Sequence, residues 1–119
     1  MIPLINLGKS PLKVSRLCLG SMMFADQTDL AEARSMVAYG HANGCNFIDT
    51  AEMYSVPTRA ETYGATETIM GHWLAHNPGM RQRIVLATKV AGPSRDTPWV
   101  RAGQGMTAQD ILASCDASL

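Results

Sequence analysis

The segments CNFIDTAEMY (45–54) and RIVLATK (83–89) contain apolar runs with the character of buried strands, and each run ends abruptly in a charged residue. Asp49 ends the first run, Tyr54 follows it by five positions, and Lys89 ends the second run. In open α/β sheets and in βα barrels, ligands bind at the rim where the carboxyl ends of parallel strands open. We therefore interpret Asp49, Tyr54 and Lys89 as candidate catalytic residues on such a rim.

Strands and helices are expected to alternate along the rest of the chain. A hairpin of two short strands comes first, and three further strands are each followed by a helix. This order predicts an α/β fold with a parallel sheet and right-handed crossovers. The expected strands are 4–7, 12–14, 16–20, 45–49 and 84–88. The expected helices begin at Thr28 or Asp29, near Thr66 and near Thr107.

Each expected helix has an apolar stripe at helical spacing. Asp29 with Glu32, and Thr107 with Asp110, have the spacing of residues that cap the start of a helix. Gly44 suits the left-handed position that follows the first helix. The apolar stripes are Leu30, Ala33, Val37 and Gly40 in the first helix, Ile69, Met70, Trp73 and Leu74 in the second, and Ile111, Leu112, Cys115 and Leu119 in the third.

The composition favours a small globular domain and argues against two classes of partner. The chain has 119 residues, for which we expect one domain over 1–119. Its 10 Lys and Arg residues balance 10 Asp and Glu residues, which argues against a nucleic-acid or membrane-surface partner. Hydrophobic residues make up 46% of the chain, and no apolar run approaches the roughly 18 residues of a transmembrane helix. The N-terminus also lacks the features of a signal peptide.

The three cysteines indicate neither a metal site nor a disulfide framework. Cys18, Cys45 and Cys115 are widely spaced and form no CxxC pair, so we expect no zinc site. Cys18 and Cys45 fall inside apolar strands, where we expect each thiol to behave as a small buried hydrophobe. Free thiols favour a reducing compartment, and we therefore expect a cytoplasmic protein.

Elementary electrostatics indicates how the candidate residues could act together. Adjacent parallel strands lie about 4.8 Å apart, so Asp49 can reach the Lys89 ammonium at the matching strand end. Burial lowers the pKa of a lysine and a nearby carboxylate raises it, so the two groups would stay charged together. Tyr54 can fold back over the same rim. A phenol beside a fixed ammonium becomes a stronger acid and hence a usable proton donor.

Each of these residues also has an ordinary structural explanation when it is taken alone. An aspartate at a strand end often caps a turn, a tyrosine in a loop often packs half-buried, and a lysine at a strand end is often solvated. Their joint occurrence at two consecutive strand ends is what favours the catalytic interpretation. From these residues alone, both the catalytic and the structural interpretation stay open.

Four motifs resemble those of the aldo-keto reductases, a family of NADP(H)-dependent (β/α)8 barrel enzymes. Within this family the chain is most similar to the Tas-type bacterial oxidoreductases, judged by the loops SVPTRAET and AGPSR. The resemblance implies the N-terminal part of a (β/α)8 TIM barrel, with about three βα units preceded by a hairpin. The motifs are LCLGSMMF (17–24), GCNFIDTAEMY (44–54), GATETIMGHWL (64–74) and VLATKV (85–90).

The resemblance implies an oxidoreductase that reduces an aldehyde or ketone to an alcohol with NADP(H). The family uses a catalytic tetrad of Asp, Tyr, Lys and His, and Asp49, Tyr54 and Lys89 align with the first three. Tyr54 would be the general acid that protonates the carbonyl oxygen. Lys89 would strengthen that acid, and Asp49 would hold Lys89. The hydride would come from the nicotinamide.

The same resemblance implies part of a cofactor site. Gly20, Ser21 and Met22 match the segment that lies, together with Asp49, against the nicotinamide ribose in relatives. Met22 and the two residues after it, Met23 and Phe24, could line a substrate pocket or simply pack the mouth of the barrel. The loop 91–105, with Trp99 and two arginines, lies on the ligand-facing side but identifies no substrate. Glu67, near the start of the second helix, is read as structural.

The length of the chain limits the activity that we expect from it. A complete βα barrel needs about 250 residues. The tetrad histidine follows the fourth strand in this family, and we attribute His41, His72 and His76 to the helices instead. We therefore expect little or no activity from these 119 residues alone. Two alternatives are a non-catalytic interaction or regulatory fragment, as in the related potassium-channel β subunits, and a non-functional gene fragment. The oligomeric state is not indicated.

Overall fold

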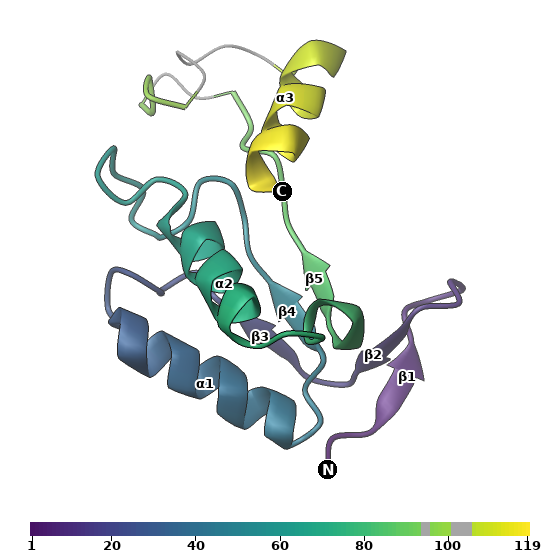
Figure 1. Ribbon diagram of the computed structural model, residues 1–119. Coiled ribbons are helices and arrows are strands. Elements are labelled where there is room, and N and C mark those ends of the chain that lie inside the picture. The colour runs from purple at the N-terminus through teal and green to yellow at the C-terminus, as the bar shows by residue number, and fades with distance from the viewer. Residues whose placement is uncertain (94–95, 101–105) are drawn as a thin grey trace.

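Strands and helices alternate in the computed structural model, which describes residues 1–93, 96–100 and 106–119 (Figure 1). The expected α/β order is confirmed. An antiparallel hairpin of β1 (Leu4–Asn6) and β2 (Lys13–Ser15) precedes a parallel sheet in the order β3 (Cys18–Gly20), β4 (Phe47–Asp49), β5 (Val85–Ala87). The helices α1 (Leu30–Ala42), α2 (Ala65–His76) and α3 (Ala108–Ser118) each follow one strand of this sheet, and a 3-10 turn, η1 (Arg81–Arg83), precedes β5.

The core lies between the parallel sheet and the pair of helices α1 and α2. Leu19, Ile48 and Leu86 stand side by side in the strand register and point toward these helices. Side chains alternate across a strand, so their neighbours in the sequence point to the opposite face. The helices contribute the apolar stripes expected of them, with Ala33 and Val37 buried on α1 and Ile69, Met70 and Trp73 buried on α2.

The ends of α1 explain how the chain turns back into β4. The Asp29 side chain accepts a hydrogen bond from the backbone N–H of Glu32 at 2.9 Å and so caps the helix start. Gly44 follows the helix with a φ of +91°, and a side chain there would crowd Met1. This left-handed position favours glycine. The connection from α1 to β4 is therefore short, as expected.

The hairpin is hydrogen-bonded to the amino end of β4, at the opposite end of the strand from the rim. Asn46, just before β4, accepts a hydrogen bond from the Ser15 N–H at 2.7 Å and donates one to the Lys13 carbonyl at 3.0 Å. Apolar side chains of the hairpin region remain exposed, namely Leu4, Ile5, Leu7, Leu12 and Leu17. No helix among the described residues is both long and apolar enough to cross a membrane.

The expected burial of Cys18 is wrong, whereas that of Cys45 is confirmed. Cys18 pairs in register with Phe47 and neighbours Leu19, which points into the core. Cys18 therefore points to the other face of the sheet. No element of the described chain covers that face well enough to bury it, so the apolar run predicted the strand but not the exposure of this thiol.

The apolar stripe that the sequence predicted for α3 is largely exposed. The helix begins as predicted, because Thr107 and Asp110 form a capping box. The exposed residues of this stripe include Ile111 at 43% and Leu112 at 67%, and Leu119, directly after the helix, is 95% exposed. Cys115 is exposed as well, and Ser114 is the buried residue of the helix. Helical periodicity identifies residues that share a face, but it does not say whether anything covers that face.

Candidate functional site

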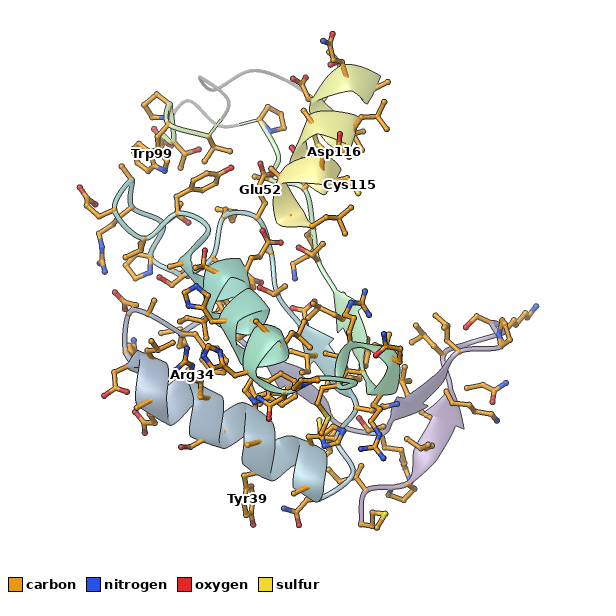
Figure 2. The ribbon with its side chains drawn as sticks, in the orientation of Figure 1. Arg34, Tyr39, Glu52, Trp99, Cys115 and Asp116 are labelled. Carbon is orange, nitrogen blue, oxygen red and sulfur yellow. The ribbon has the colours of Figure 1, made fainter. Side chains whose placement is uncertain are left out.

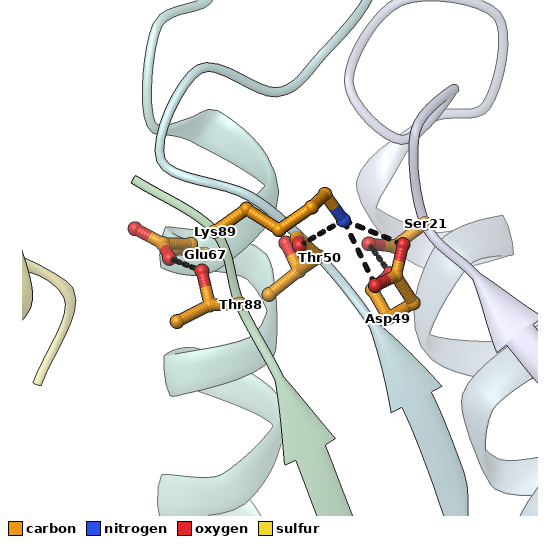
Figure 3. Close-up of polar contacts among 6 residues, drawn as sticks. All are labelled: Ser21, Asp49, Thr50, Glu67, Thr88 and Lys89. Atoms are coloured by element: carbon orange, nitrogen blue, oxygen red, sulfur yellow. Dashed lines mark hydrogen bonds and ion pairs between the residues drawn. The ribbon is translucent and has the colours of Figure 1, made fainter. Parts of the chain in front are cut away.

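Asp49 and Lys89 form an ion pair at the carboxyl ends of β4 and β5 (Figure 3). Asp49 is the last residue of β4 and lies in register between Gly20 and Ala87. The Lys89 ammonium donates to both Asp49 carboxylate oxygens, at 2.8 and 2.7 Å. It also donates to the Thr50 carbonyl at 2.8 Å. The ammonium is thereby fixed above the end of β4, where the sequence placed it.

Tyr54 folds back over the same rim, as expected. Its loop is folded locally, because the Tyr54 N–H donates to the Ala51 carbonyl at 3.1 Å and Ala51 is buried. The Lys89 ammonium lies over the Tyr54 ring, 4.8 Å from its centre. A cation at this distance from an aromatic ring is attracted to it. The structure therefore brings together the three residues that the sequence singled out.

The pKa of Lys89 is raised above its ordinary value by the balance of two opposing causes. Partial burial is the largest single contribution and lowers the pKa, but hydrogen bonding and charge interactions with Asp49 and Tyr54 together outweigh it. The side chains of Lys89 and Asp49 are 47% and 38% exposed, so solvent screens the pair. The site keeps a positive charge fixed beside a phenol throughout the neutral pH range.

An Asp49→Asn variant should lose the part of the folding stability that depends on the charged lysine. Because the folded-state pKa of Lys89 is raised, the lysine's contribution is fully present below the unfolded-state pKa of about 10.4 and is lost as the pH rises through the folded-state pKa. The free energy of unfolding should therefore differ between wild type and variant near pH 7, and the difference should shrink above about pH 10.4. Denaturant unfolding across this range measures it, and a difference that does not change with pH would contradict it.

The segment after β3 borders the ion pair on its other side. The Ser21 N–H and hydroxyl both donate to the Asp49 carbonyl, at 3.0 and 2.8 Å, and Ser21 is fully buried. A side-chain carbon added at Gly20 would meet no atom within 4 Å, so the rim is open there. The exposed Met22 accepts from the Val56 N–H through its carbonyl at 3.0 Å. Phe24, by contrast, is buried in the core with residues of α1 and α2, whereas the sequence had suggested either a substrate pocket or the mouth of the barrel.

Thr88, between the end of β5 and Lys89, is hydrogen-bonded to α2. The Thr88 hydroxyl donates to the Glu67 carboxylate at 2.5 Å (Figure 3), and the Ser118 hydroxyl of α3 donates to the same carboxylate at 3.0 Å. Glu67 therefore joins α2 to the end of β5 and to the last turn of α3. These bonds agree with the structural role expected for Glu67.

Sequence reasoning missed two groups that complete the rim. One is the Thr50 carbonyl, which cannot be recognised from a sequence because it belongs to the backbone. The other is Glu52, whose carboxylate is buried in the loop that carries Tyr54. A signal for Glu52 did exist, since an acidic residue stands between Ala51 and Met53 in an otherwise apolar stretch next to Asp49.

The histidines lie on the helices, as expected, and not at a strand end. The His41 ring on α1 lies 6.4 Å from the Trp73 ring on α2, measured between centroids. His76 contacts the His72 carbonyl along α2 at 2.7 Å. In the loop 91–105, Arg95 and Arg101 fall outside the described residues, and Trp99 is partly exposed.

Comparison with known proteins identifies the family. The model of the aldo/keto reductase family matches residues 16–119, which include the whole parallel sheet and all three helices. The chain belongs to the aldo/keto reductase family. Its described elements correspond to three βα units of a (β/α)8 barrel, preceded by the hairpin. The fold inferred from the motifs is thus confirmed.

Individual relatives and a solved structure agree with this assignment. The Protein tas of Escherichia coli is 44% identical over 111 residues, which are 92% of this chain and 32% of that protein. The 6-dehydroglucose reductase of Novosphingobium aromaticivorans is 36% identical over 85 residues, or 71% of this chain and 28% of that protein. A solved structure, the holo form of aldo-keto reductase AKR11C1 from Bacillus halodurans, aligns with a TM-score of 0.62 at 33% identity and covers 81% of this chain and 28% of that one.

The resemblance to Tas-type oxidoreductases is confirmed by the first of these relatives. The chain spans about a third of the length of the curated relatives it matches. The family is one of oxidoreductases that act on small carbonyl compounds.

Proposed function

We propose that the rim around Asp49, Tyr54 and Lys89 belongs to an NADP(H)-dependent oxidoreductase that reduces an aldehyde or ketone to an alcohol. Residues 1–119 would be the N-terminal portion of its catalytic domain. The observation that supports this most directly is the position of the Lys89 ammonium, which pairs with the Asp49 carboxylate and lies 4.8 Å from the centre of the Tyr54 ring.

Each of the three residues has a distinct part in the proposed reaction. Tyr54 donates its phenolic proton to the carbonyl oxygen as negative charge develops there. The Lys89 ammonium favours this transfer because a nearby positive charge stabilises the phenolate that remains. Asp49 keeps the ammonium charged and directed at the rim through its two hydrogen bonds. A proton donor positioned in this way accelerates a reaction by about 10²–10⁴-fold.

The residues at the end of β3 fit one edge of a nicotinamide cofactor site. Gly20 leaves open space above the sheet, Ser21 locks its loop onto the Asp49 carbonyl, and Met22 presents an exposed side chain. Together with Asp49 they would hold the ribose next to the nicotinamide. When bound, NADPH supplies the hydride for the carbonyl carbon. The residues of this chain would orient the carbonyl group and supply the proton.

A chimaera tests the proposal. Residues 1–119 replace the matching N-terminal segment of the E. coli Protein tas, so that the rim is supplied by this chain and the remainder by its relative. We expect the chimaera to consume NADPH when an aldehyde or ketone is added, measured by NADPH absorbance with aromatic and aliphatic carbonyl compounds. A folded chimaera that binds NADPH but reduces none of them would contradict the proposal. The 119-residue chain is assayed in parallel.

A further inference from the structure

Glu52 joins the loop that carries Tyr54 to the segment that carries Lys89. Glu52 is only 4% exposed, and its side chain lies between the first turn of α2 and the last turn of α3 (Figure 2). One carboxylate oxygen accepts from the Tyr63 hydroxyl at 2.8 Å, and the other accepts from the Ala91 N–H at 2.7 Å. The Glu52 backbone N–H donates to the Lys89 carbonyl at 3.0 Å.

These bonds begin where the regular pairing of β4 with β5 stops. The last strand pair is Asp49 with Ala87, and the Thr50 N–H still donates to the Ala87 carbonyl at 2.9 Å. Beyond that point Glu52 bonds the backbone on both sides of Val90, at the Lys89 carbonyl and at the Ala91 N–H. Glu52, in the neighbouring loop, thus bonds the backbone from which the Lys89 side chain departs.

The buried Glu52 carboxylate needs hydrogen-bond donors around it. Burying an ionised carboxylate is unfavourable unless it is well hydrogen-bonded. Hydrogen bonds from a hydroxyl and a backbone N–H to a charged oxygen are short and strong. Glu52 stands three residues after Asp49 and two before Tyr54, so it also fixes the loop that carries the phenol.

We infer that Glu52 is a positioning residue, which holds the segment 89–91 so that the Lys89 ammonium stays between the Asp49 carboxylate and the Tyr54 ring. The catalytic meaning of this position rests on the proposed function, whereas the position itself does not. Two substitutions distinguish the effect of the length of the Glu52 side chain from the effect of its charge. Glu52→Gln keeps the length of the side chain, its amide oxygen can still accept from Ala91, and its amide group can donate to Tyr63. Glu52→Asp keeps the charge but is one methylene too short to contact both partners.

The Lys89 titration reports whether the ammonium stays in place. The chain has three lysines, Lys9, Lys13 and Lys89, so NMR of lysine labelled with ¹³C at Cε gives three side-chain signals. We expect the raised pKa of Lys89 to be retained in Glu52→Gln and to fall to that of a solvated lysine in Glu52→Asp. Lys13 lies in β2 and Lys9 in the turn before it. In Figure 1 this hairpin lies at the other end of the parallel strands from the loop that follows β4, so the two signals serve as internal controls.

The opposite results overturn the inference. If Glu52→Gln lowers the pKa of Lys89, or if Glu52→Asp leaves it raised, Glu52 does not act by holding the backbone. Amide hydrogen exchange covers the case in which Glu52→Asp fails to fold. The Ala91 amide should be protected in wild type and in Glu52→Gln, and exchange there as fast as in an exposed loop would also reject the inference. Neither measurement uses a substrate, so an inactive chimaera would count against the proposed function alone.

Discussion

Replacing Tyr54 with phenylalanine should reduce carbonyl reduction by the chimaera by about 10²–10⁴-fold, the range attributed to a positioned proton donor. The substitution removes only the phenolic oxygen and keeps the ring beside the Lys89 ammonium. The cation–ring attraction and the packing of the loop should therefore survive. The rate of NADPH consumption at saturating carbonyl compound measures the loss, and the affinity for NADPH should change little because the rim still contains Asp49 and the end of β3.

Tyr39→Phe is the matched control for this experiment. Tyr39 is exposed on α1 and points away from the rest of the molecule (Figure 2), so removal of its hydroxyl should leave the rate unchanged. A Tyr54→Phe chimaera with the rate of the parent would show that another group supplies the proton. An equal loss in Tyr39→Phe would instead indicate a general effect of the substitutions on folding.

Ile48→Ala should cost about 2–5 kcal/mol of folding stability, the range for a large aliphatic side chain removed from a core. Ile48 is 1% exposed on the central strand and packs against the helices α1 and α2. Small domains have only about 5–15 kcal/mol of stability in total. We therefore expect the cooperative thermal transition of the 119-residue chain to be lost or shifted far down. Circular dichroism during heating measures this change.

Phe47→Ala, one residue earlier on the same strand, should cost less even though it removes a larger side chain. Phe47 points to the sheet face opposite the helices and is only half-buried. In a well-covered core, Phe→Ala costs about 3–5 kcal/mol. A Phe47→Ala variant that is as unstable as Ile48→Ala would mean that this face is covered in solution. The comparison thus probes the open side of the sheet directly.

The sequence predicted the fold well where short-range patterns determine it. Apolar runs that end in Asp49 and Lys89 identified two neighbouring parallel strands, and the helix caps at Asp29 and Thr107 are where the spacing placed them. The ion pair and the approach of Tyr54 also followed, because parallel strands bring their carboxyl ends together. These are consequences of local periodicity and of a fixed strand spacing.

Features that depend on what covers a surface could not be predicted in this way. Cys18 and the stripe of α3 belong to apolar patterns, yet both are exposed, because burial requires a second element opposite them. The burial of Glu52 was not predicted, for the converse reason. A carboxylate in a loop is usually solvated, and only the three-dimensional structure shows that it meets Tyr63 and the backbone of Ala91.

The hydrogen bonds from Tyr63 and from Ala91 to the Glu52 carboxylate should constrain the sequences of related chains differently. Ala91 contributes a backbone N–H, which every amino acid except proline supplies. Position 91 should therefore accept any other residue that is small enough for a buried site. Tyr63 contributes a side-chain hydroxyl, and its replacement removes this hydrogen bond from a buried carboxylate oxygen. Substitutions at positions 52 and 63 should therefore be correlated across homologues, whereas position 91 should vary independently of both and exclude only proline and bulky residues.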